Sequence, residues 1–127
     1  MNALIDTGCE INLIKTGFLP TKHFERCNSG IRLVTANGGL LGGGIRKTKQ
    51  TLFIGVRHTT GEKATLKYLT AFYEADIACD AILSYRWLSY YHLDVYCRHN
   101  CLATLRQGVI YILPSVDSEE DDDFDLS

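Results

Sequence analysis

Short runs of apolar and β-branched residues recur along this chain of 127 residues, and residues typical of turns separate them. Such a pattern is typical of short β-strands joined by tight turns. The predicted strands cover residues 2–6, 11–14, 31–36, 48–56, 64–73, 93–97, 101–105 and 109–113, and a short apolar run over 78–83 is interrupted by Asp80. We therefore expect a β-rich domain of about eight short strands.

Glycine-containing turns punctuate these strands. Asn37-Gly38 favours a hairpin, and Gln107-Gly108 and residues 59–62 (Thr-Thr-Gly-Glu) predict two further turns. Five of the eight residues from 37 to 44 are glycine. Because glycine costs order, this segment predicts either a mobile loop or a backbone that approaches another group closely.

One short helix is expected over residues 85–91, with Ser84 placed to cap it. The segment carries four aromatic residues: Tyr85, Trp87, Tyr90 and Tyr91. We expect these side chains to pack in the core and in a dimer interface, and a peptide-binding groove is the alternative.

Composition is that of an ordinary globular protein, with 46% hydrophobic and 22% charged residues. The length suits one domain with a modest core. No apolar run is long enough to span a bilayer, and the N-terminus lacks the pattern of a secretory signal, so we expect no membrane partner and a cytoplasmic or nuclear location.

Charge is distributed unevenly along the chain. The formal net charge is −2, yet seven of the fifteen acidic residues lie between positions 117 and 125. We therefore expect a folded domain over residues 1–114 and a disordered acidic tail over 115–127. Residues 1–116 carry thirteen Lys or Arg against eight Asp or Glu, which is too weakly basic and too dispersed to predict nucleic-acid binding.

The first chemical motif is Asp6-Thr7-Gly8, which directly follows the apolar run Ala3-Leu4-Ile5. A carboxylate at the end of a buried strand is costly unless it is hydrogen-bonded or has a chemical role. Thr7 supplies a hydroxyl, and Gly8 lets the backbone turn so that N–H groups approach the carboxylate. The tripeptide by itself favours an ordinary turn at the end of a strand over a catalytic loop.

A second motif makes the pattern more specific. Residues 76–88 read Asp-Ile-Ala-Cys-Asp-Ala-Ile-Leu-Ser-Tyr-Arg-Trp-Leu. This segment resembles the second signature of retroviral-type aspartic peptidases, especially those of gypsy-type LTR retrotransposons, where Asp-x-Ile-Leu-Gly leads into a short helix carrying Trp-Leu. Residues 3–14 resemble the catalytic strand–turn–strand of the family, and residues 33–44 resemble its glycine-rich flap. With matching segments at 71–73 and 93–105, the resemblance extends over roughly residues 3–113.

The resemblance implies an all-β fold, a retropepsin-like closed β-barrel with one short helix, in which each chain supplies half of the active site of a C2 dimer. It implies Asp6 as the catalytic carboxylate, Thr7 as a brace across the dimer and Gly8 as a point of close backbone access. The flap would cover an extended peptide, with these residues as its contacts: Ala36, Asn37, Gly38, Gly39 and Leu40. The family requires no metal or cofactor.

The chain departs from the family pattern at three places. Five residues precede Asp6, where family members usually have a further strand, so we expect a truncated domain or a product of a longer parent. Ser84 stands where the family has glycine, and its hydroxymethyl group either perturbs the catalytic loop or caps the helix. Cys9 replaces a small Ala or Ser and is tolerable there as a small apolar residue.

These features predict an aspartic endopeptidase, active as a homodimer, that cleaves an extended peptide or polyprotein of a retroelement. Such chemistry needs two carboxylates that share one proton, because like charges about 3 Å apart resist joint ionisation, as in the aspartic-protease dyad. The alternative is a catalytically inactive relic that serves as a dimerising or peptide-binding module.

Cysteine and histidine residues leave two further alternatives. The five cysteines are scattered without a repeated Cys-x-x-Cys. Cys97, His99 and Cys101, together with His92, could form a zinc-stabilised interaction domain, although structural zinc sites usually bring two ligand pairs. Cys9 with a histidine could form a cysteine-protease pair, but nothing in the sequence orients one toward the other.

Overall fold

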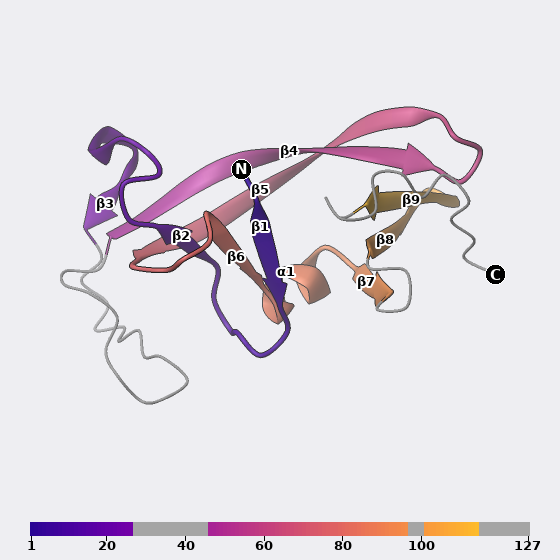
Figure 1. The fold of residues 1–127 in the computed structure, drawn as a ribbon. Helices are drawn as coiled ribbons and strands as arrows, with labels where there is room; N and C mark the ends of the chain where they lie inside the picture. The colour runs from indigo at the N-terminus through magenta and orange to yellow at the C-terminus, as the bar shows by residue number, and fades with distance from the viewer. Residues whose placement is uncertain (27–45, 97–100, 115–127) are drawn as a thin grey trace. The chain divides into compact units, whose positions relative to one another are not determined.

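The computed structural model describes residues 1–26, 46–96 and 101–114 (Figure 1). Its strands are β1 Ala3–Asp6, β2 Leu13–Lys15, β3 Glu25–Arg26, β4 Arg46–His58, β5 Lys63–Ala75, β6 Ala81–Ser84, β7 Leu93–Tyr96, β8 Cys101–Arg106 and β9 Val109–Pro114. The helices described are the 3-10 turn η1 Thr21–His23 and the α-helix α1 Tyr85–Tyr90. The predicted all-β character is therefore confirmed, with one short α-helix in the described ranges.

Hydrogen bonds join the strands in the order β1-β6-β2-β5-β4-β9-β8-β7, and β3 pairs with β4. The chain divides into two compact units, one made of Met1–Thr51 and Leu69–Trp87, the other of Leu52–Tyr68 and Leu88–Ser127. The long strands β4 and β5 each contribute to both units.

The first unit contains β1, β2, β3, β6 and parts of β4 and β5. β1 runs parallel to β6, while β2 pairs antiparallel with β6 and parallel with β5. Its buried apolar side chains come from β2, β5, β6 and α1: Leu13, Ile14, Phe72, Ala75, Ala81, Leu83 and Trp87. These contacts fix the position of the short strands that lead into the Asp6 and Ser84 segments.

The second unit contains the antiparallel strands β7, β8 and β9, with β9 paired to the end of β4. Gln107 and Gly108 form the β8–β9 turn with φ angles of 52° and 78°, so the turn predicted there is confirmed. Tyr68 is fully buried in this unit, and Tyr91 meets its ring edge-on at 4.7 Å between centroids.

β4 and β5 are longer than the sequence pattern predicts, at thirteen residues each instead of the expected 48–56 and 64–73. The added residues are mostly polar and carry little intrinsic strand signal. Ladder partners extend β4 at both ends: Arg46 is opposite Arg26 of β3, and Arg57 is opposite Ile112 of β9. Pairing with distant segments thus determines where these strands begin and end.

In the part of the chain that the structure describes, no helix is long and apolar enough to cross a membrane.

Candidate functional site

Asp6 lies at the C-terminal end of β1 and is half-buried. The apolar residues before it form a parallel ladder with β6, in which Ala3 is opposite Ala81 and Asp6 is opposite Ser84. Two segments that are far apart in the sequence therefore meet at the carboxylate. This register places the Asp-Thr-Gly motif beside the Ile-Leu-Ser segment of the second motif.

The Asp-Thr-Gly segment forms a tight turn around the carboxylate. The Gly8 backbone N–H donates a hydrogen bond to Asp6 Oδ1 at 2.9 Å, and the Cys9 N–H donates to the Asp6 carbonyl at 3.1 Å. A Cβ atom added at Gly8 would lie 3.3 Å from Asp6 Oδ1, closer than an ordinary van der Waals contact. Glycine therefore fits here because the backbone approaches the carboxylate closely. Thr7 and Gly8 are both exposed.

Ser84 lies at the junction of β6 and α1 and is 1% exposed. Its Oγ accepts a hydrogen bond from the Trp87 N–H at 3.3 Å, so the predicted helix cap is confirmed. The next residue, Tyr85, donates its N–H to the Cys9 carbonyl at 3.2 Å, which ties the start of the helix to the loop after Asp6.

The aromatic residues of this segment divide between two faces. Trp87 is buried and its Nε1–H donates to Thr70 Oγ1 at 3.0 Å, whereas Tyr91 is half-buried. Tyr85 and Tyr90 are 47% and 77% exposed, so these two do not pack in the core, and their packing in a dimer interface stays a prediction. A helix buries side chains three or four residues apart, and the buried face of α1 contains Trp87 and Leu88.

Asn12 is a further residue of this site, and it is not among the residues predicted from the sequence. Its Oδ1 accepts hydrogen bonds from the backbone N–H of Ser84 at 2.8 Å and from the Ser84 hydroxyl at 2.9 Å, and its Nδ2 donates to the Ala71 carbonyl at 3.1 Å. The available signal was a lone amide inside the otherwise apolar run from Ile11 to Ile14. A polar side chain at such a position calls for hydrogen-bond partners.

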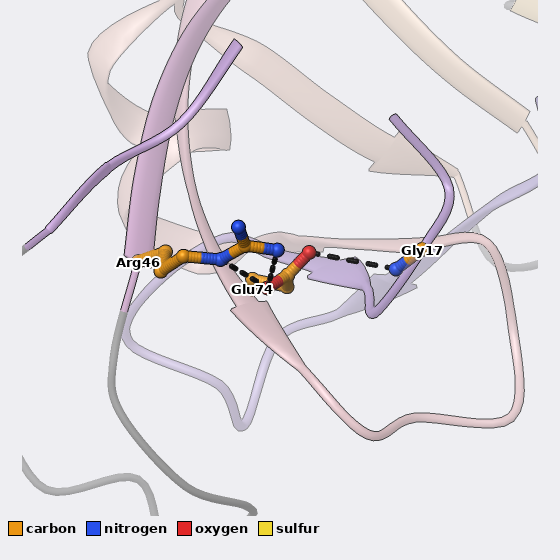
Figure 2. A network of polar contacts seen from close by, with 3 residues as sticks. All are labelled: Gly17, Arg46 and Glu74. Atoms are coloured by element: carbon orange, nitrogen blue, oxygen red, sulfur yellow. Dashed lines mark hydrogen bonds and ion pairs between the residues drawn. The ribbon is translucent and has the colours of Figure 1, made fainter. Parts of the chain in front are cut away.

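The expected flap residues (Ala36, Asn37, Gly38, Gly39 and Leu40) lie outside the described residues. The structure describes the two segments that flank them, where Glu25 of β3 is opposite Lys47 of β4. Arg46, at the start of β4, donates from Nε to Glu74 Oε1 at 2.8 Å, and its Nη2 lies 2.7 Å from the same oxygen. Figure 2 shows that the other oxygen of Glu74 faces the Gly17 N–H, which donates to it at 3.4 Å.

The Glu74 side chain is 8% exposed, and the Arg46 guanidinium also lies over the Phe24 ring at 4.9 Å. A second ion pair, Arg86–Glu10, joins the helix to the loop after Asp6 at 3.9 Å, but both of its side chains are exposed. Charge pairs of that kind contribute little stability. Loss of the Arg46–Glu74 pair is therefore expected to lower the free energy of unfolding more than loss of the Arg86–Glu10 pair.

The thiol of Cys9 donates to the Ile11 carbonyl at 3.0 Å, and the thiol of Cys79 donates to the Ala81 carbonyl at 3.5 Å. Of the residues suggested for zinc, Cys97 and His99 lie outside the described ranges, while Cys101 is buried on β8 and His92 precedes β7 with φ of 55°. Within residues 1–26, 46–96 and 101–114, no group of three or more His, Cys, Asp or Glu is arranged to hold a metal ion.

Comparison with known proteins finds no match to a protein-family model, to a curated protein sequence or to a solved structure.

Proposed function

We propose that this chain is an aspartic endopeptidase of the retroelement type, built on a retropepsin-like fold and active as a homodimer. The observation that carries the proposal is the β1–β6 register, which places Asp6 opposite Ser84. In the sequence these residues belong to the two segments that resemble the signatures of this peptidase family. A parallel ladder between them supports a single site rather than two unrelated turns.

The geometry of the carboxylate supports the same proposal. Asp6 is the last residue of β1, which pairs with the largely buried strand β6. The hydrogen bond from the Gly8 N–H orients Asp6 Oδ1. Asp6 as a whole is half-buried rather than enclosed, as a site that must meet a second carboxylate and a substrate requires. Thr7 lies exposed beside it, which suits a contact to another chain.

In the proposed reaction, two copies of Asp6 share one proton. The ionised carboxylate removes a proton from a water molecule, and the water oxygen attacks the carbonyl carbon of the scissile peptide bond. The protonated carboxyl donates its proton to the carbonyl oxygen as the tetrahedral intermediate forms. Collapse of that intermediate breaks the C–N bond: the leaving nitrogen takes the proton that the first carboxylate removed from water. A hydroxyl of the intermediate returns its proton to the second carboxylate, which restores the shared proton. Because the chain contains one Asp-Thr-Gly, the second carboxylate comes from a second copy.

The first test is the mass of the protein in solution, measured by sedimentation equilibrium over a concentration series at mildly acidic pH, with and without a statine-type inhibitor. We expect a concentration-dependent dimer that the inhibitor stabilises, because it binds the completed site. A monomer at every concentration with the inhibitor present would contradict the proposal, since one carboxylate would remain without its partner.

The second test is cleavage of an unfolded protein or peptide library. We expect turnover that is favoured at acidic pH and lost in Asp6→Asn, which keeps the shape of the side chain but cannot act as a base. The matched control is Asp94→Asn, which changes an exposed carboxylate on β7. Equal turnover by wild type and Asp6→Asn would exclude Asp6 as the catalytic group.

A further inference from the structure

Asn12 connects three elements of the first unit through one side-chain amide. Its oxygen accepts two hydrogen bonds from Ser84, and its nitrogen donates one to Ala71 of β5. Its backbone carbonyl also accepts a hydrogen bond from the Tyr73 N–H at 3.0 Å. The amide therefore joins the end of the Asp6 loop to the end of β6 and to β5.

Ser84 is the partner of this amide and also the residue opposite Asp6 in the β1–β6 ladder. Its hydroxyl is satisfied in both roles, since it donates to Asn12 Oδ1 and accepts from the Trp87 N–H. The family that the chain resembles has glycine at this place, and the hydroxymethyl group of serine is accommodated here by the amide of Asn12.

We infer that Asn12 and Ser84 form a positioning pair for Asp6. The loop from Asp6 to Asn12 is held at one end by the β1–β6 ladder and at the other by the Asn12 amide. Two hydrogen bonds from Ser84 and one to Ala71 restrict the far end of the loop. This restriction also limits the motion of the Gly8 N–H, which orients the carboxylate. The role in catalysis rests on the proposed function, whereas the effect on the loop does not.

Three variants separate the contributions of the pair. Asn12→Ala removes all three side-chain hydrogen bonds, and Ser84→Ala removes the hydroxyl while the backbone N–H of residue 84 still donates to Asn12. Asn12→Asp keeps an acceptor for Ser84 and loses the donor to Ala71, so it serves as a partial rescue. Gln50→Ala is the control, because it removes an amide that bonds Thr48 in the same unit.

The readout is the Gly8 amide in a ¹⁵N–¹H NMR spectrum, which reports its hydrogen bond to Asp6 whether or not the protein is active. In the wild type we expect the Gly8 resonance to move between neutral and acidic pH, and Asp6→Asn to abolish that movement. In Asn12→Ala we expect the movement to shrink by half or more and the amide to exchange with solvent about tenfold faster or more. Ser84→Ala and Asn12→Asp are expected to lie between Asn12→Ala and wild type, and Gln50→Ala to match wild type.

Cleavage assays on the same variants test the catalytic part. We expect kcat to fall about tenfold or more in Asn12→Ala with KM nearly unchanged, since the amide orients the carboxylate and does not contact the peptide. A Gly8 resonance in a folded Asn12→Ala protein that titrates and exchanges as in the wild type would overturn the positioning role. If neither the wild type nor any variant cleaves the substrate while the Gly8 resonance responds as expected, the pair orders the loop, and only the proposed peptidase function is contradicted.

Discussion

Gly8 lies where a side chain would crowd the carboxylate of Asp6. Its N–H donates to Asp6 Oδ1 at 2.9 Å, and an added Cβ would lie 3.3 Å from that same oxygen. If a larger residue replaced Gly8, the carboxylate of Asp6 would have to move. At the residue scale, then, glycine serves the geometry of Asp6 rather than a left-handed backbone.

We predict that Gly8→Ala lowers the proposed peptide cleavage by about tenfold or more, while the free energy of unfolding changes little. A shift of a few tenths of an ångström at the carboxylate proposed to react would have a large kinetic effect. Gly55→Ala is the matched control, since a Cβ there meets no atom within 4 Å. The control should cleave as the wild type does and be equally stable or slightly more so. Equal loss of activity in both variants would point to a general effect of glycine replacement.

Tyr68 supplies a pH-dependent part of the stability. Burial raises the pKa of its phenol above the ordinary value of 10.0, and the Arg106 guanidinium, 4.8 Å above the ring, offsets this only partly. The folded state therefore holds the phenolic proton more tightly than the unfolded chain. Below pH 10 both states keep the proton, so stability is unaffected, and it declines as the pH rises through the folded pKa.

We predict that the free energy of unfolding, measured in urea from about pH 8 to about pH 11, falls more steeply above pH 10 in the wild type than in Tyr68→Phe. The free energy of unfolding of Tyr68→Phe should still decline somewhat above pH 10, because burial also raises the pKa of Tyr91. Tyr85→Phe, at an exposed position, should behave as the wild type. Identical slopes in wild type and Tyr68→Phe would show that Tyr68 is not the group responsible.

At the scale of elements, side-chain pairs between distant strands hold the ends of the long strands. Arg46 begins β4, and Glu74 lies near the end of β5, twenty-eight residues away. Glu74 also accepts a hydrogen bond from the Gly17 N–H, and the Arg46 guanidinium lies over the Phe24 ring. The Glu74 carboxylate therefore links the start of β4 to the loop after β2 (Figure 2). Breaking this network costs more than breaking an exposed ion pair, because Glu74 is almost enclosed and Arg46 loses its charged partner.

We predict that Glu74→Gln lowers the free energy of unfolding by about 1–2 kcal/mol, because the variant keeps the shape but loses the charge-assisted hydrogen bonds to Arg46. Glu10→Gln is the matched control, since it makes the same chemical change in the exposed pair with Arg86. Glu10→Gln should lower the free energy of unfolding by less than about 0.5 kcal/mol. Denaturation in urea measures both values, and equal losses would contradict the assigned difference in burial.

At the scale of the whole molecule, the proposed activity depends on assembly. The chain has one Asp-Thr-Gly, so each active site would contain one carboxylate from each of two copies. Activity should then depend on the composition of the dimer and not simply on the amount of wild-type protein. This property can be measured without knowing the cleavage preference.

We predict that mixing wild type with Asp6→Asn at constant total concentration, after time for exchange, lowers activity as the square of the wild-type fraction. In an equimolar mixture about one quarter of the dimers contain two wild-type chains, so activity should fall to about one quarter. Asp94→Asn in place of Asp6→Asn should leave activity unchanged. A linear decline to about one half would mean that each chain acts alone.

Some features of the fold could be predicted from neighbouring residues alone. The turn at Gln107-Gly108 and the cap at Ser84 depend on backbone and side-chain preferences within a few residues, and both are present. The Asp6 turn is of the same kind, because Gly8 lies two residues from the carboxylate that its N–H contacts. Which of the four aromatic residues pack in the core could not be predicted, because this depends on the helical face that each residue occupies.

Within the described residues, the sequence by itself determined most of the strands, the turns at 59–62 and 107–108, and the presence of a carboxylate beside glycine, because each follows from interactions local in the chain. Tertiary structure alone decided the ends of β4 and β5, the Arg46–Glu74 pair and the role of Asn12, whose partners Ser84 and Ala71 are 72 and 59 residues away. A polar side chain signals that it needs partners, but only the folded chain determines which distant groups supply the hydrogen bonds.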